Sequence, residues 1–149
     1  MALKVELKPG ERIIIGDCVI TNDKQRTRLF IDGKSPILRE KDILTPETAN
    51  TPAKRVYLTV QLMYLDGNVD NHADAFVELL GDYLKAAPSS AAIVERINNK
   101  ILTGELYKAL REAKALISHE EERLGHAEFG GSGVWKDSPG NGQSAGVGS

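Results

Sequence analysis

The sequence predicts an α+β protein: a small N-terminal antiparallel β-sheet or barrel, then a four-helix bundle, then a disordered tail. Three observations lead to this prediction. Apolar residues alternate with period two up to about Glu47, recur at helical spacing from residue 51, and lose all periodicity in a Gly- and Ser-rich C-terminal stretch. We therefore expect a β domain over 1–47, a helical domain over 51–127 and a tail over 128–149.

The β domain is predicted from short strand-like runs separated by turn pairs. The first run, Leu3 to Leu7, alternates apolar and charged residues, as a half-buried strand does. The turn pairs that follow are Pro9-Gly10, Gly16-Asp17, Asn22-Asp23 and Asp32-Gly33. They bound further strands at about 13–15, 18–21, 28–31 and 37–39. Asp32-Gly33 is a typical hairpin pair, and Cys18 is expected to be a small core residue of the third strand.

Four amphipathic helices are predicted after the strands. Thr51 followed by Pro52 is typical of a helix N-terminus, and Gly67 ends that helix. A second helix is expected over about 70–86 and is stopped by Pro88. A third begins at a serine cap within PSSAAIVERINNKILTG, and a fourth is expected from Glu105 to about Leu124. Each has an apolar stripe on one face, which predicts that the helices pack together.

Length and composition bound the class of protein. The 149 residues are 41% hydrophobic and 27% charged, which is ordinary for one soluble globular domain. A single cysteine rules out an internal disulfide and favours the cytoplasm. The opening MALKVELKPGE does not resemble a secretory signal, and no apolar run reaches the roughly 18 residues of a membrane span. We therefore expect a cytoplasmic protein without a membrane partner.

The sequence offers no arrangement typical of catalysis. Gly10 and Gly16 do not form a phosphate loop, because no Lys-Ser/Thr pair follows and the residues between them favour a strand. His119 and His126 are seven residues apart, whereas metal ligands on one helix are usually three or four apart. We therefore predict a protein that is not an enzyme and that has no cofactor and no metal site.

Charge leaves the question of nucleic-acid binding open. The net charge of −2 is nearly neutral, so any site for RNA or DNA must be local. If the first and fifth strands are neighbours, Lys4, Lys8 and Arg39 form one basic edge that can hold phosphates. The alternative is that these residues are solubilising surface charges among the carboxylates of the same region.

Long stretches of the chain closely resemble the FlbT family of bacterial flagellar post-transcriptional regulators. The stretches are LKPGERIIIGDCVITN, LREKDILTPE, TPAKRVYLTVQLMYL and INNKILTGELYKALREA, and the resemblance covers roughly residues 1 to 127. It implies a regulator of flagellin synthesis that associates with the 5′ untranslated region of flagellin mRNA and modulates its translation and decay. Such a protein represses or activates without catalysis of its own.

The strand region is also similar, more weakly, to the CsrA family of small RNA-binding proteins. The similarity is carried by Gly10-Glu11, by Ile15-Gly16-Asp17 and by Arg39-Glu40. It implies an intertwined homodimer in which the first strand lies beside the partner's fifth strand. Lys8 and Arg39 match basic residues of that family, although Glu6 and Leu7 stand where that family is basic.

The charge pattern and these resemblances together give a set of candidate RNA-binding residues: Lys4, Lys8, Arg12, Arg39 and Lys41. The expected partner is the flagellin mRNA leader, and flagellin itself or another flagellar regulatory protein is a further candidate. The alternative function is that of a protein-binding adaptor or flagellin/export-chaperone partner that affects the mRNA indirectly. The near-neutral charge and the large helical region favour that alternative.

Overall fold

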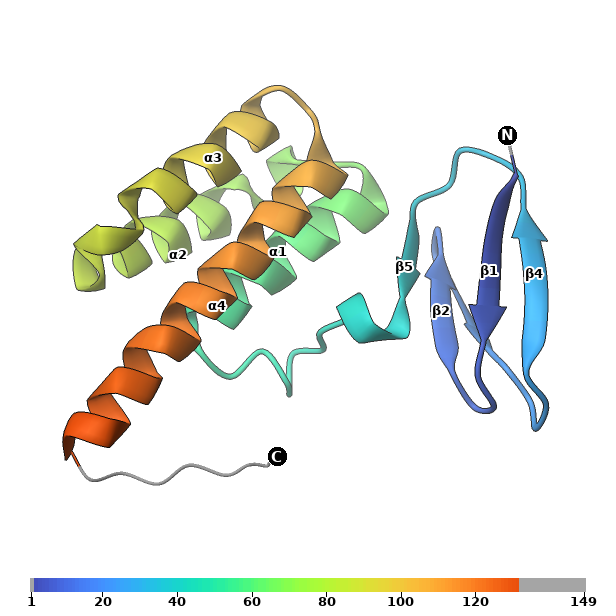
Figure 1. Ribbon diagram of the computed structural model, residues 1–149. Helices are drawn as coiled ribbons and strands as arrows, with labels where there is room; N and C mark the ends of the chain where they lie inside the picture. Colours follow the sequence, from blue (N-terminus) through green and yellow to red (C-terminus); the bar gives the residue numbers. More distant parts are fainter. Residues whose placement is uncertain (1, 132–149) are drawn as a thin grey trace. The chain divides into compact units, whose positions relative to one another are not determined.

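The computed structural model describes residues 2–131, and side chains as far as Gly125. Contacts divide the chain into two units, residues 1–113 and 114–149, and each is described by itself. Figure 1 shows strands at the N-terminal end and four α-helices after them. The predicted α+β class, with small antiparallel sheets followed by four helices, is confirmed.

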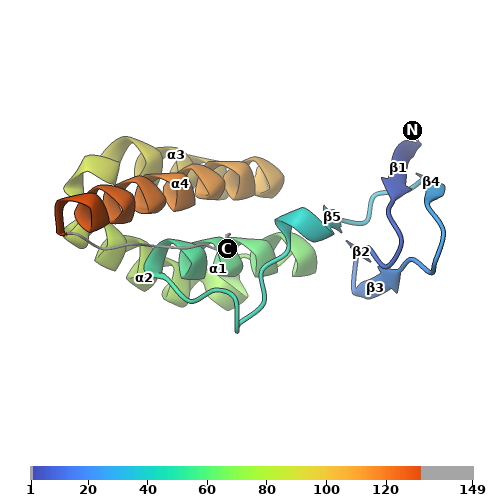
Figure 2. The same cartoon turned by 60° about the horizontal axis from the view of Figure 1, so that its bottom comes forward.

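Five short strands make up two antiparallel sheets. They are β1 (Leu3–Leu7), β2 (Arg12–Ile15), β3 (Cys18–Thr21), β4 (Thr27–Ile31) and β5 (Ile37–Arg39). One sheet pairs β1 with β4, and the other has the order β3-β2-β5 (Figures 1 and 2). Val5, Leu7 and Ile13 are buried between the strands, with Ile15, Leu29, Ile31 and Ile37 packed against them. The period-two pattern of β1 therefore predicts its buried face correctly.

Two details of the predicted strand region are wrong. The chain bends at Gly33 after β4, but Asp32-Gly33 does not join a hairpin, because β4 pairs with β1 and β5 pairs with β2. A turn pair fixes only the local backbone, whereas the pairing of β5 depends on its fit against β2. Cys18 is exposed rather than a core residue, and its Sγ lies 3.5 Å from Asp17 Oδ1. All four residues of β3 are exposed, so the apolar residues of this strand do not belong to the core.

The helices follow the predicted positions closely. They are α1 (Pro52–Asp66), α2 (Ala73–Ala86), α3 (Ala91–Leu102) and α4 (Leu106–Gly131), with short 3₁₀ turns η1 (Glu40–Asp42), η2 (Asp70–His72) and η3 (Pro88–Ser90). Thr51 Oγ1 accepts a hydrogen bond from Lys54 N at 3.2 Å, which is the predicted N-cap of α1. Gly67, at φ 68°, ends the helix in the left-handed conformation that glycine adopts without strain.

The predicted ends of two helices need correction. Ser90 precedes α3, but its hydroxyl donates to the Ala87 carbonyl at 2.7 Å and makes no cap contact with α3. The fourth helix continues to Gly131 instead of ending near Leu124. Residues 128–131, which the sequence predicts as part of the tail, are therefore helical, although the glycine pair at 130–131 has low helix propensity. The rest of that predicted tail, 132–149, lies outside the described residues.

Contacts within the first unit join the helices and attach the strand region to α1. The rings of Tyr64 and Tyr107 lie 5.5 Å apart, linking α1 to the start of α4, and Arg96 Nε donates to Glu112 Oε1 at 2.9 Å between α3 and α4. The Tyr64 hydroxyl bonds both the N–H and the carbonyl of Ile37, each at 3.1 Å, along the free edge of β5. Gln61, only 4% exposed, does the same at Leu44 with two 2.9 Å bonds.

Tyr57 makes a third attachment of this kind. Its hydroxyl donates to the carbonyl of Asp42, and the side chain is almost fully buried. Desolvation, the Asp42 carboxylate and Tyr107 together raise the pKa of Tyr57 well above its usual value, so the hydroxyl stays a donor. Three polar side chains of α1 thus hold the connection between β5 and the helices in a fixed path.

The second unit, as far as it is described, is the continuation of α4 from Lys114 to Gly131. Leu116 and Glu120 are buried, one turn apart, and the intervening Ser118 is exposed. Leu116 continues the apolar stripe that is expected of an amphipathic helix, whereas the burial of the charged Glu120 is not part of that pattern. Among residues 2–131, no helix combines the length and hydropathy that crossing a bilayer requires.

Candidate functional site

The strand region carries a cluster of charged side chains on β1, β2, β4, β5 and the adjoining turns, which we call the cationic cluster. It contains six cations, Lys8, Arg12, Arg26, Arg28, Arg39 and Lys41, and three carboxylates, Glu6, Glu11 and Glu40. Six positive charges less three negative charges leave a local net charge of +3, although the whole chain carries −2. The positive excess belongs to these nine side chains and not to the strand region as a whole, because residues 1–47 hold nine cations and eight carboxylates, among them Asp23 and Asp42 beside the same turns.

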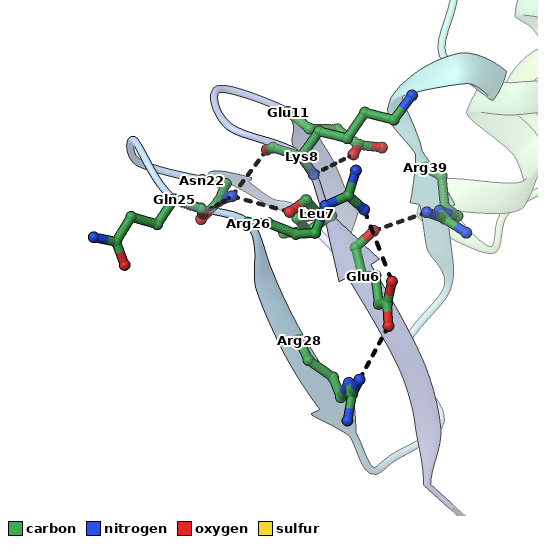
Figure 3. A network of polar contacts seen from close by, with 9 residues as sticks. All are labelled: Glu6, Leu7, Lys8, Glu11, Asn22, Gln25, Arg26, Arg28 and Arg39. Carbon is green, nitrogen blue, oxygen red and sulfur yellow. Dashed lines mark hydrogen bonds and ion pairs between the residues drawn. The ribbon is translucent and has the colours of Figure 1, made fainter.

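Glu6 is the centre of one half of the cluster (Figure 3). Antiparallel pairing of β1 with β4 places Glu6 opposite Arg28, and their side chains meet at 3.3 Å. Arg26 Nη1 lies 3.8 Å from the other carboxylate oxygen. All three side chains are about half exposed, so these ion pairs stabilise the fold by at most about 1 kcal/mol each and can exchange partners.

Arg39 joins β5 to β1 through the same residue. Its Nη2 donates to the main-chain carbonyl of Glu6 at 3.0 Å, on the edge of β1 away from β4. Its Nε is buried and makes no hydrogen bond among the described residues. A buried guanidinium N–H without a partner costs free energy, so this arginine is only partly satisfied by the protein.

The other half of the cluster surrounds the turn at Pro9-Gly10. Lys8 and Lys41 line one shallow pocket of about 360 Å³ together with Glu11 and Glu40. Glu11 Oε1 accepts from Lys8 N at 2.8 Å, and Glu40 Oε1 accepts from Arg12 N at 2.6 Å. The carboxylates thus satisfy main-chain amides, while both lysine ammonium groups are exposed and make no ion pair in the described part of the chain.

Asn22 holds the turn in place beneath these side chains. Its Nδ2 lies within 3.2 Å of three carbonyls, those of Leu7, Lys8 and Gln25 (Figure 3). Gly10 has φ 74°, which lets its amide reach the Asp23 carbonyl at 2.9 Å. The position of Lys8 is therefore fixed by the backbone rather than by a flexible loop.

Four of the five sequence-predicted site residues fall within this cluster. Lys8, Arg12 and Lys41 surround the Pro9-Gly10 turn, and Arg39 reaches β1 two positions before Lys8. Lys4 is apart from them: it faces Phe30 across the β1–β4 ladder and is separated from Lys8 by Glu6. The first and fifth strands do not pair, yet the Arg39 side chain bridges them, which the sequence could not specify.

Sequence reasoning left two members, Arg26 and Arg28, out of the candidate site. The antiparallel pairing of β1 with β4 is the feature that would have indicated them, since its register places Glu6 opposite Arg28. Within the described residues, no group of three or more His, Cys, Asp or Glu side chains is arranged to hold a metal ion. The cationic cluster offers guanidinium and ammonium groups, which bind phosphate or carboxylate.

The fold and the site define an α+β protein that presents a cationic strand edge beside a set of helices. Comparison with known proteins then gives its family. Residues 3–124 match the family described as "Flagellar protein FlbT", and the chain belongs to this FlbT family. No solved structure matches the chain.

Relatives in other bacteria carry names that describe a regulator. The chain is 59% identical over 129 residues to the "Probable flagellum biosynthesis repressor protein FlbT 1" of Bradyrhizobium diazoefficiens, which covers 86% of this chain and 88% of that protein. It is 55% identical over 124 residues to a protein of the same description from Rhodopseudomonas palustris, covering 83% and 98%. It is 35% identical over 133 residues to the "Flagellum biosynthesis repressor protein FlbT" of Caulobacter vibrioides, covering 87% and 94%.

Proposed function

We propose that this chain is a cytoplasmic repressor of flagellum biosynthesis that binds the 5′ untranslated region of flagellin mRNA and modulates its translation and decay. The repressor role follows the names of its relatives. The observation that supports RNA as the ligand is the local excess of positive charge around Glu6 and the Pro9-Gly10 turn. No catalysis by this chain is part of the proposal.

The cationic cluster suits a phosphodiester backbone because its cations are accessible to phosphate. Two arginines share an exposed carboxylate, and two lysines make no ion pair among the described residues. Arg26 and Arg28 share one exposed carboxylate, Glu6, which a phosphate oxygen can replace at small cost. Lys8 and Lys41 have exposed ammonium groups on the same shallow pocket. A strand of RNA lying along β1 would contact both halves, and occupancy of a leader segment would hinder ribosome access.

Salt dependence tests whether these cations contact phosphates. Fluorescence anisotropy with labelled flagellin leader RNA and a scrambled control is measured over a series of salt concentrations. The Lys8→Ala/Lys41→Ala variant removes two phosphate contacts, so we expect the slope of log K against log salt to fall by about 2. A control variant of equal charge, Lys24→Ala/Lys34→Ala, removes lysines outside the cluster and should bind as the unchanged protein does.

Arg39 tests specificity rather than charge. Arg39→Lys keeps the positive charge but loses the planar fork that reads a base edge or a phosphate bidentately, so specific binding is expected to weaken by about 1–3 kcal/mol. Circular dichroism checks that the fold survives the loss of the bond to Glu6. Equal affinity of both cluster variants and the unchanged protein for leader RNA would remove this site from the proposal.

The alternative is a protein-binding adaptor that acts on the mRNA indirectly. It is favoured by the overall charge of −2 and by the presence of three carboxylates inside the cluster. A pull-down with purified proteins distinguishes the two functions. Capture of flagellin or another flagellar regulator, without retention of naked RNA at physiological salt, supports the adaptor.

A homodimer through the strand region remains part of the proposal. Sedimentation measures the oligomeric state directly. A mass twice that of the 149-residue chain is expected, and variants that break the contacts between the strands of the two subunits should sediment as monomers. Measuring the sedimentation mass and the affinity for leader RNA on the same sample shows whether leader binding requires the dimer.

A further inference from the structure

An open apolar groove lies between α2 and α3, in the helical region and away from the residues of the cationic cluster. Its volume is about 480 Å³, and its lining includes Val77, Leu80, Gly81 and Leu84 from α2 and Ala91 and Val94 from α3. Val77 is 66% exposed, although valine is among the residues most often buried. The groove therefore exposes Val77 and Ala91 to solvent and Leu84 and Val94 in part, whereas Leu80 is buried.

Gly81 stands at the middle of α2 without a structural reason inside the chain. It is not in the left-handed conformation, and a Cβ built on it would meet no atom within 4 Å. Glycine inside a helix is less favourable than alanine by roughly 1 kcal/mol. The missing side chain leaves a hollow in the groove, and such a hollow allows the close approach of another backbone or side chain.

The rim of the groove is acidic. Asp74, Glu78 and Asp82 recur every four residues along α2. Glu78 and Asp82 each follow a lining residue, and Glu95 lines the groove from α3. None of these four carboxylates makes an ion pair among the described residues, and Lys85 is the cation that follows them on α2. Like charges four apart on a helix repel each other, and a cationic ligand removes that repulsion.

We propose that the α2–α3 groove docks an amphipathic helix of a partner protein whose apolar face is flanked by lysine and arginine. Apolar side chains at positions i, i+3, i+4 and i+7 of that helix would lie along Val77, Leu80, Leu84 and Val94, which is the helix-in-groove mode of recognition. The helix would cross closest at Gly81, and its cations would face Glu78 and Glu95. The same acidic rim repels phosphate, so this surface binds protein and leaves RNA to the strand region.

The proposal is tested with the full chain and a synthetic probe. The probe is an amphipathic Leu/Lys peptide of about five helical turns, and the comparison peptide has glutamate at every lysine position. Fluorescence anisotropy measures affinity, and amide chemical shifts identify the surface. We expect the Leu/Lys peptide to bind and to shift the amide of Gly81, and we expect the Leu/Glu peptide not to bind.

Two pairs of variants make the test specific. Gly81→Leu places a side chain in the hollow, where its Cβ meets no atom within 4 Å, whereas Ala92→Leu adds the same side chain to an exposed position of α3 outside the lining. Glu78→Lys/Glu95→Lys reverses two rim charges, whereas Asp32→Lys/Glu47→Lys makes the same change in charge elsewhere. The groove variants should each weaken binding by about tenfold or more, and their controls should not. Thermal unfolding shows whether each variant is folded.

Several outcomes would overturn the proposal. Equal binding of both peptides, or no loss of affinity in Gly81→Leu, would mean that the groove does not select a basic helix. Self-association that Gly81→Leu abolishes would assign the groove to a second copy of this chain. Chemical shifts confined to the strand region would place the peptide elsewhere. Failure of RNA binding in the earlier experiments has no bearing on these results, because the two surfaces share no residue.

Discussion

The strand region and the helical region of the first unit are stabilised in different ways. The helices share a core of fully buried apolar residues, among them Val56, Val60, Met63, Ile97 and Leu110. The strands bury only Val5, Leu7, Ile13 and Leu38, a core too small to stabilise such a region by itself. Polar contacts complete it: Asn22 holds the turn, and three side chains of α1 hold β5 and the linker.

This difference explains where function can be placed. Burial of charged groups is costly, so a region that depends on apolar packing keeps them at its margin. The strand region has little interior, and most of its side chains are exposed. It can therefore present six cations and three carboxylates together with little desolvation, Arg39 with its buried Nε being the exception. The helices supply the stability, and the strands supply the charged surface.

The largest expected effect comes from reducing the small strand core. Ile13 is fully buried, and Ile13→Ala should lower the free energy of unfolding by about 2–5 kcal/mol. Because few neighbours are available to fill the space, we expect hydrogen exchange to increase throughout β1, β2 and β5 more than in the helices. Urea unfolding and amide exchange measure the two quantities.

A matched substitution controls this experiment. Val19, on β3, is 62% exposed, so Val19→Ala removes apolar volume from the same sheet with an expected change within about 0.5 kcal/mol. If Ile13→Ala instead raises exchange equally in strands and helices, the two regions unfold as one cooperative unit and the contrast drawn above fails.

An intermediate effect is expected at Gln61, which connects the two regions. Gln61→Leu leaves both the N–H and the carbonyl of Leu44 without their partner, and such a loss costs about 1–3 kcal/mol. Leu44 is half-buried, so water replaces the amide only in part. Urea unfolding gives the cost, and faster amide exchange at Leu44 locates it.

The control for Gln61 is a glutamine of the strand region. The Gln25 side chain is exposed and makes no hydrogen bond among the described residues, its main-chain carbonyl being the atom that Asn22 contacts. Gln25→Leu is expected to change stability by less than about 0.5 kcal/mol. Equal effects at both positions would show that the linker is not fixed by α1.

The sequence was sufficient where structure depends on neighbours in the chain. Helical periodicity, the Thr51 cap and the positive-φ glycines predict α1 to α3 and the turns, because these depend on residues within a few positions. It failed where structure depends on distant pairing. The ladder of β5 with β2 and the exposure of Cys18 are settled by the arrangement of strands, which turn residues do not encode.

The candidate site divides in the same way. Lys8, Arg12, Arg39 and Lys41 were found from charge and family resemblance, and they lie on or beside adjoining strands. Arg26 and Arg28 were missed because their role depends on the register of β4 against Glu6. Lys4 shares a strand face with Lys8, which is why the charge pattern predicts it, but the ion-paired carboxylate of Glu6 separates the two lysines.

The smallest expected effect is a pH dependence at the end of α1. Desolvation raises the pKa of Asp66, but the hydrogen bonds from His72, at 2.7 Å, and from the Asn68 amide, together with the charge of His72, lower the pKa by more. A carboxyl whose pKa is lower in the folded state stabilises the fold at pH values above its unfolded pKa, about 3.9. That contribution is lost as pH falls through the lower, folded pKa.

Urea unfolding of the unchanged protein and of Asp66→Asn from pH 7 to pH 2.5 (roughly the span of the carboxyl titration) measures this contribution. We expect Asp66→Asn to be less stable near neutral pH and the two curves to converge below about pH 4. The difference is small because Asp66 is 43% exposed and solvent screens its contacts. In a His72→Ala background, most of the difference in stability that Asp66→Asn causes near neutral pH should disappear, because the main hydrogen-bond partner of Asp66 is gone. A difference that persists at low pH would show that the substitution acts on the α1–α2 connection through packing rather than through the carboxylate.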